Sequence, residues 1–125
     1  MTQYLSAEQI LGAPDLKTED VPVPEWGGTV RVQELSGADR DKFESSFVTT
    51  SGGQAVAVDS GGLVGFRARL AAASIVDENG KRMFRSDAEV KRLGAKSAAA
   101  LQRVCEAAMR LSGLTEQDVE ELVKA

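Results

Sequence analysis

The segment that most constrains the fold is Ser97–Ser112, where apolar residues recur at helical spacing. Its apolar positions are Leu101, Val104, Cys105, Ala108 and Leu111. Polar residues occupy most of the opposite face, and Gly113 follows as a helix terminator. An amphipathic helix is stable mainly because its apolar stripe packs on a core. With 125 residues the chain is large enough for one such core, so we expect a single domain over residues 1–125.

The N-terminal third predicts a short helix followed by a β-hairpin. Ser6 and Gln9 form a capping-box pattern around an expected helix at Ala7–Leu11. Two extended segments, Thr18–Val23 and Thr29–Glu34, flank a Trp-Gly-Gly turn. Apolar and polar residues alternate in the second segment, and Pro22 and Pro24 at the end of the first favour a sheet edge. We therefore expect a one-sided antiparallel sheet.

The middle of the chain predicts a capped helix and then a loop. Ser36 is an N-cap for a helix that begins near Gly37, with Phe43 and Phe47 one turn apart. We expect this helix to cover the sheet. The stretch Thr49–Gly62 has two Gly-Gly steps and lacks large apolar residues, so we expect a flexible loop there.

The C-terminal half is predicted to be mostly helical. We expect a helix over Leu63–Ser74, a type I′ hairpin turn at Asn79 and Gly80, and a short helix with a capping box that ends at Gly94. A last amphipathic helix is expected over 114–125. Together these elements predict an α+β fold in which small antiparallel hairpins pack against several helices.

The sequence lacks the residues from which common catalytic and metal sites are built. It has no histidine and one cysteine, which excludes histidine-based triads, common zinc sites and an internal disulfide. Cys105 lies on the apolar stripe, which favours an inert buried thiol over a nucleophile. Neither the glycines near Gly61 nor the acidic turn near Asp77 has the full pattern of a P-loop or a calcium loop. We predict a non-enzymatic protein without cofactor or metal; an enzyme using carboxylates is the weakest hypothesis.

Charge and hydropathy narrow the kinds of partner. A net charge of −4 argues against nucleic-acid binding, which usually requires a basic surface. No apolar run approaches the roughly 20 residues that cross a bilayer, and the N-terminal residues lack a signal-peptide pattern. We expect a cytoplasmic protein that binds neither nucleic acid nor membrane.

Certain exposed or amphipathic positions are candidates for contact with a protein partner. Trp26 is either a binding anchor or a plug at the end of the sheet. Basic residues around the second hairpin form either a docking patch or ordinary surface charge. The acidic C-terminal helix either packs on the core or docks on a partner. The candidate partner-binding residues are Trp26, Phe66, Leu70, Arg82, Arg85, Leu101, Val119 and Leu122.

Four segments that span most of the chain carry a family resemblance. They are PEWGG at 24–28, VRVQELSGADRDKFE at 30–44, VDENGKRMF at 76–84 and LGAKSAAALQRVCEAAMRLSGLTEQDVEEL at 93–122. In combination they resemble the tail assembly chaperones of long-tailed bacteriophages, the siphophages. That family consists of small α+β proteins, and the absence of a catalytic constellation agrees with it.

The resemblance implies a function in building the phage tail. Such chaperones are made in the host cytoplasm, coat the tape measure protein, recruit tail tube subunits and are absent from the mature virion. Many also have a longer, frameshifted form whose added domain contacts the tube protein, and this chain then corresponds to the short form. The role calls for many self-associating copies with apolar grooves, which we expect to be lined by Leu63–Ser74 and Ser97–Ser112. The alternative is a structural or connector component of the tail that remains in the virion.

Overall fold

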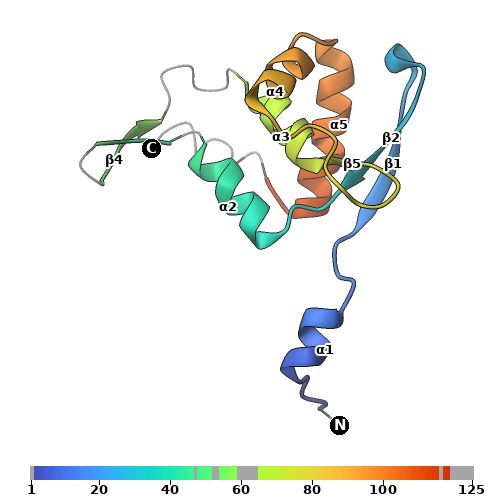
Figure 1. Cartoon of the computed structure of the whole chain (residues 1–125), viewed down its shortest axis with the longest axis vertical. Coiled ribbons are helices and arrows are strands. Elements are labelled where there is room, and N and C mark those ends of the chain that lie inside the picture. Colours follow the sequence, from blue (N-terminus) through green and yellow to red (C-terminus); the bar gives the residue numbers. More distant parts are fainter. Residues whose placement is uncertain (1, 47, 52–53, 59–64, 116, 119–125) are drawn as a thin grey trace.

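Helices and strands follow one another along most of the chain in the computed structural model, which describes residues 2–46, 48–51, 54–58, 65–115 and 117–118. In chain order they are α1 (Ala7–Gly12), β1 (Thr18–Val23), the 3-10 helix η1 (Pro24–Trp26), β2 (Gly28–Gln33), α2 (Gly37–Ser45), β3 (Val48–Ser51), β4 (Gln54–Val58), α3 (Phe66–Ser74), β5 (Ile75–Val76), α4 (Asp87–Gly94) and α5 (Ala98–Ser112). Antiparallel strands and separate helices make this an α+β fold with a helical C-terminal half, as the sequence predicts (Figure 1). Among the described helices, none is long and apolar enough to span a membrane.

The main sheet has three antiparallel strands in the order β1–β2–β5. Val21, Val23 and Val32 are buried. On the other face, the exposed residues Asp20 and Arg31 form an ion pair across the strands at 3.5 Å. β1 is an edge strand, the position where a proline is tolerated. The sheet is therefore one-sided, as the alternation of apolar and polar residues predicts.

Helix α5 packs against β1 and β2 and also against α3. Its buried positions recur at helical spacing and include Leu101, Val104 and Ala108. Several of the buried positions on both helices are alanines, which let α3 and α5 approach closely. The expected amphipathic helix thus contributes a large share of the hydrophobic core formed by the described residues.

Helix α2 packs against α3 instead of covering the sheet, so the expected position of this helix is wrong. The rings of Phe43 and Phe66 meet edge-to-face with their centroids 5.4 Å apart. Phe43 is the buried residue of α2, whereas α5 buries a whole stripe and covers more of the sheet's apolar surface. Phe47, the other aromatic residue expected on this face, lies outside the described residues.

A two-stranded hairpin occurs where the sequence predicted a loop over Thr49–Gly62. Strands β3 and β4 pair antiparallel, with Val48 opposite Val58. β-branched residues in both strands favour an extended backbone even where large apolar residues are scarce. The expectation of a loop is wrong for the paired residues, while 59–62 lie outside the described part of the chain.

The turn after β5 differs in type from the predicted one. Gly80 has a φ of +81° but Asn79 does not have a positive φ, which excludes a type I′ turn. The Gly80 N–H donates to the Asp77 carbonyl at 3.0 Å, so the turn begins one residue earlier than expected. The Asp77 carboxylate accepts hydrogen bonds from the N–H groups of Asn79 and Lys81, at 2.8 and 3.0 Å. This side chain therefore selects the observed turn.

Side-chain caps begin α1, α2 and α4 at the predicted serines, whereas α3 begins at Phe66 without a side-chain cap. Ser6 and Gln9 form a capping box at α1, and a second capping box forms at α4. Thr115 and Asp118 exchange two hydrogen bonds, at 2.8 and 3.1 Å, as expected for the cap of the last predicted helix. Residues 119–125 of that helix lie outside the described range.

Gly113 ends α5 in the left-handed conformation, with a φ of +69°. A Cβ built there meets nothing within 4 Å, so strain in the backbone is the cost of adding one. We expect Gly113→Ala to lower the free energy of unfolding by about 1 kcal/mol. Gly12→Ala is the matched control, because its Cβ also meets open space but its φ is not positive. Urea denaturation of both variants checks this; equal midpoints would contradict it.

The N-terminal arm, residues 2–17, stands apart from the rest of the molecule (Figure 1). All of its residues are exposed, and α1 buries none. The arm meets the sheet where the Glu34 N–H donates to the Lys17 carbonyl at 2.8 Å and the Lys17 N–H donates to the Glu34 carboxylate at 3.2 Å. These bonds fix the start of β1 and leave α1 in solvent.

Candidate partner-binding groove

The tip of the β1–β2 hairpin carries Trp26 on the short helix η1. Arg103 of α5 donates two hydrogen bonds to the Glu25 carboxylate, at 2.8 and 3.1 Å. These bonds hold the pKa of Glu25 below its usual range. The tip is thereby tied to α5, with Trp26 half-buried against the core.

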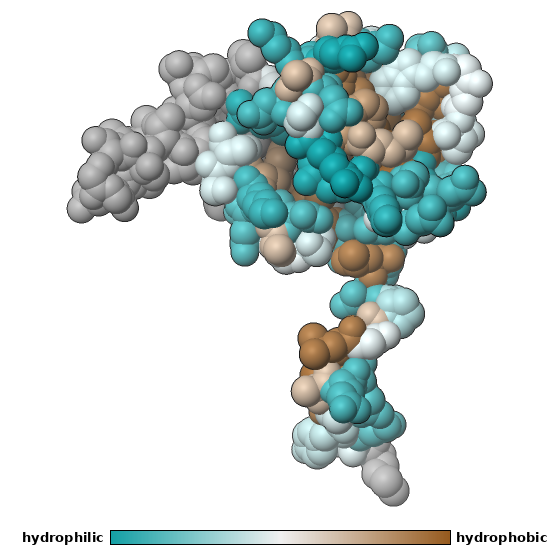
Figure 2. Space-filling view, viewed as in Figure 1, coloured by the Kyte–Doolittle hydropathy of each residue, from teal (hydrophilic) through white to brown (hydrophobic). Residues whose placement is uncertain are grey.

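Trp26 belongs to an apolar groove of about 560 Å³. The apolar residues that line this groove are Trp26, Val30, Ile75, Met83, Phe84 and Leu93. Its remaining lining residues come from α4 and the turn after it, and they are Glu89, Arg92, Ala95 and Lys96. Apolar surface is visible between polar side chains in the upper part of the body (Figure 2).

The groove has a rigid floor and an accessible wall. Ile75 and Leu93 are buried members of the core, so the floor cannot move without disturbing the fold. Val30 and Phe84 are half-buried, whereas Met83 is 53% exposed. Burying these apolar surfaces in a complex would remove them from water, the main favourable contribution to protein association.

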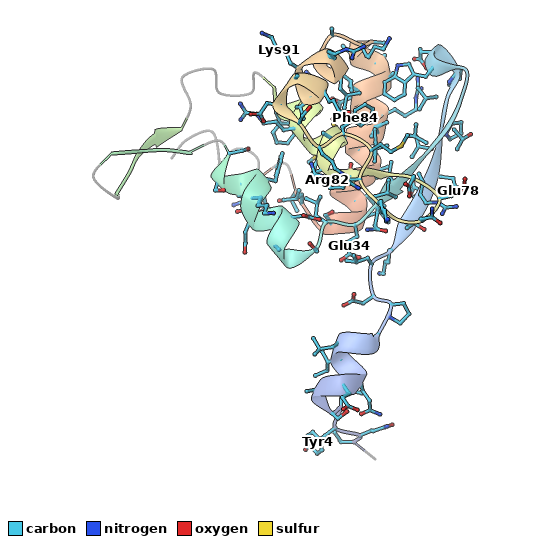
Figure 3. The ribbon with its side chains drawn as sticks, in the orientation of Figure 1. Tyr4, Glu34, Glu78, Arg82, Phe84 and Lys91 are labelled. Atoms are coloured by element: carbon cyan, nitrogen blue, oxygen red, sulfur yellow. The ribbon has the colours of Figure 1, made fainter. Side chains whose placement is uncertain are left out.

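Arg82 holds the segment that carries Met83 and Phe84. Its guanidinium donates to the Ala72 carbonyl at 3.2 Å and to the Phe84 carbonyl at 3.3 Å. Arg85 in turn donates to the Arg82 carbonyl at 3.1 Å. Figure 3 shows Arg82 and Phe84 on the same connecting segment in front of the helices. Arg82 therefore positions a wall of the groove, and Arg85 is an exposed residue that braces Arg82 through this bond.

Comparison with known proteins identifies the family. A family model described as phage tail assembly chaperone matches residues 13–124. The chain belongs to the phage tail assembly chaperone family. The match covers almost the whole chain and begins directly after α1, so the arm helix lies outside the span shared with this family.

A solved structure agrees with this assignment. The tail assembly chaperone of bacteriophage HK97 has a TM-score of 0.54 with this chain, at 19% sequence identity, over 80% of this chain and 92% of that chain. At this level of identity the likeness shows a shared fold. No curated protein sequence matches the chain.

In this tail assembly chaperone, the residues predicted to contact a partner are spread over different environments. Trp26 lines the groove, consistent with both of its predicted roles. Phe66, Leu70 and Leu101 are buried in the core, where they pack α3 on its neighbours, and their contact with a partner stays a prediction. Leu63, Val119 and Leu122 lie outside the described residues.

Sequence reasoning missed most of the groove. Val30, Met83, Phe84 and Leu93 come from three separate segments, and none of them was a candidate. One signal was available, because Met83 and Phe84 are adjacent large apolar residues in a segment that is otherwise basic. Successive side chains of an extended segment point to opposite faces, so such a pair favours exposure of one of its two members.

Cys105 of this family member is buried, and burial makes its thiol unreactive. Burial raises the pKa of Cys105 to about 12, and its Sγ donates to the Arg67 carbonyl at 3.3 Å. At pH 8 the thiolate fraction is then roughly a thousandfold smaller than in the unfolded chain. The thiol of the unfolded chain ionises at a lower pH than the buried thiol of the folded chain. The contribution of Cys105 to the free energy of unfolding therefore falls as pH rises above about 9.

We expect a thiol-reactive dye at pH 8 to label native Cys105 at least about a hundredfold more slowly than the chain unfolded in urea. Absorbance of the released dye anion gives both rates. Equal rates would show that the thiol is accessible and would contradict the inert role predicted from its place on the apolar stripe.

The described residues contain no cluster of side chains suited to hold a metal ion. Within that part of the chain, no group of three or more carboxylate or thiolate side chains lies close enough together to hold an ion. The groove itself contains a single carboxylate, that of Glu89, which accepts hydrogen bonds from the Ser86 N–H and hydroxyl in the α4 capping box. The groove is therefore suited to apolar contact.

Proposed function

We propose that this chain is a tail assembly chaperone that binds and solubilises the tape measure protein and helps recruit tail tube subunits around it. The observation that carries the proposal is the open apolar groove on a fold of this family. It presents aromatic and methionine side chains, which are enriched at the centres of protein interfaces. A chaperone role of this kind requires binding without catalysis.

The chemistry of the groove fits an amphipathic helix. Such a helix inserts apolar side chains at positions i, i+3 and i+4 into a matching hydrophobic groove. The exposed cations Arg92 and Lys96 at the rim suit a helix with acidic residues beside its apolar stripe. Long apolar helical faces are expected on a tape measure protein, and they aggregate unless they are covered.

The remaining parts of the role follow from the same proposal. Copies of the chain self-associate along the tape measure protein in the host cytoplasm and leave before the virion is complete. A longer, frameshifted form supplies the domain that contacts the tail tube protein. The competing proposal, a connector retained in the virion, predicts that the chain is present in purified phage particles.

Co-expression with fragments of the tape measure protein from the same phage tests this function. We expect fragments that are insoluble alone to stay soluble with the chain, in complexes whose scattering mass corresponds to several copies per fragment. Trp26 is the single tryptophan, so its emission should shift to shorter wavelength when a fragment without tryptophan fills the groove. Fragments that remain in the pellet beside an unchanged monomer would overturn the proposal.

A further inference from the structure

The N-terminal arm exposes more large apolar side chains than any other described segment. Tyr4 is 88% exposed, Leu5 62%, Ile10 57% and Leu11 86%. Figure 2 shows apolar side chains open to solvent along the arm, and Figure 3 places Tyr4 at its far end. Apolar surface of this extent on a projecting segment is typical of a segment that binds another protein.

The local sequence of the arm prepares it to be a helix, although the helix is too short to be stable alone. α1 has six residues, well below the roughly 12 that an isolated helix needs. Its capping box at Ser6 is complete, and Leu5 and Ile10 stand at the two positions of a hydrophobic staple. A capped helix that buries none of its residues gains stability when its apolar face is covered.

The groove and the arm complement each other in polarity and charge. The arm carries the exposed acids Glu8 and Asp15 near its apolar residues. The groove has an apolar lining with the exposed cations Arg92 and Lys96 at its rim. Opposite charges around an apolar contact orient the partners and exclude alternative poses.

We propose that the arm of one copy docks in the apolar groove of a second copy. The arm leaves the molecule at the start of β1, whereas Trp26 of the groove lies past the other end of this strand, about 20 Å away along its six residues. The donor and acceptor surfaces therefore differ, and each copy can use both at once. A contact between two different surfaces does not have to close into a ring, so copies join head to tail into open chains.

This docking also regulates the groove, a part of the inference that rests on the proposed function. A neighbour's arm shields the apolar lining until a tape measure helix displaces it. Before the tape measure protein binds, the self-association of copies is then held by a segment that lies outside the span shared with the family. The test of arm docking uses this chain alone, so its failure is separate from a failure to bind the tape measure protein.

Disulfide trapping tests where the arm docks. Two variants, Leu11→Cys and Met83→Cys, each carry one added cysteine and are purified separately, mixed and oxidised. Native Cys105 is buried and does not compete. The control mixture replaces Met83→Cys with Asp41→Cys, which places the cysteine at an exposed position on α2. We expect the mixed disulfide dimer of Leu11→Cys and Met83→Cys to form at least about tenfold faster than the dimer in the control mixture. Equal rates would overturn the proposal.

Intramolecular docking is distinguished by the chain that carries both Leu11→Cys and Met83→Cys. A disulfide confined to single chains of this variant, with none between the mixed single variants, would assign the groove to the chain's own arm. That result would overturn docking in a second copy. A ladder of disulfide-linked oligomers from the same variant supports the head-to-tail arrangement.

Light scattering over a concentration series gives an independent measure. We expect the mass of the unmodified chain to rise with concentration, and Leu11→Glu to raise the dissociation constant at least about tenfold. Gln3→Glu is the matched control, because it adds the same charge to an exposed polar position of the arm. Equal dissociation constants for the three proteins, or a monomer throughout, would overturn the proposal.

Discussion

Replacing Leu70 with alanine is expected to lower the free energy of unfolding by about 2 to 5 kcal/mol. Leu70 has no exposed surface and lies on α3, which packs against both α4 and α5. Removing its side chain leaves a cavity among close-packed neighbours that cannot fully collapse. For a domain whose total stability is about 5 to 15 kcal/mol, this is the largest effect we expect from a single truncation.

Urea denaturation followed by far-ultraviolet circular dichroism measures the effect of Leu70→Ala. Leu16→Ala makes the same chemical change on the arm, where the side chain is 39% exposed, and should alter the free energy of unfolding by less than about 0.5 kcal/mol. A loss below about 1 kcal/mol for Leu70→Ala would mean that α3 does not pack as described.

Replacing Met83 with aspartate is expected to weaken binding of a tape measure fragment at least about 30-fold. Met83 is 53% exposed, so the substitution leaves the core intact. In the complex, however, a carboxylate in the apolar groove must lose its water without gaining a partner, which is costly. The measurement is titration of the fragment followed by Trp26 emission, and the soluble yield on co-expression should fall with it.

Ala38→Asp is the matched control, because it adds the same charge at an exposed position of α2, away from the groove. Its fragment affinity should stay within about twofold of the unmodified chain. A folded Met83→Asp chain with normal affinity would exclude the groove as the tape measure site. Leu11→Glu separates the two uses of the groove, because it should weaken self-association without weakening fragment binding.

Most local features of this chain were predictable because the signals that encode them are local. The caps at Ser6 and Thr115 and the edge position of β1 follow from hydrogen-bonding groups and prolines that act within a few residues. The stripe of α5 follows from helical periodicity alone. These predictions needed no knowledge of distant contacts.

The wrong predictions share a physical cause. In each case two alternatives were similarly favoured by the nearby residues, and residues outside the predicted pattern decided between them. Asp77 offered hydrogen bonds to a turn one residue earlier than the favourable pair at Asn79 and Gly80. Helix α2 had an apolar face, but α5 had more apolar surface with which to cover the sheet. The β-branched residues of β3 and β4 outweighed their glycine-rich surroundings.

The sequence by itself determined the starts of the capped helices, the one-sided sheet and the lack of residues for common catalytic sites, because these depend on residue types and spacings read along the chain. Only the tertiary structure decided which apolar residues are core and which form a surface. Leu70 and Leu101 became core when α3 met α5, while Trp26, Met83 and Phe84 met at the groove from segments more than 50 residues apart. Burial is a property of the packed whole, so spacing along one helix or strand cannot assign it.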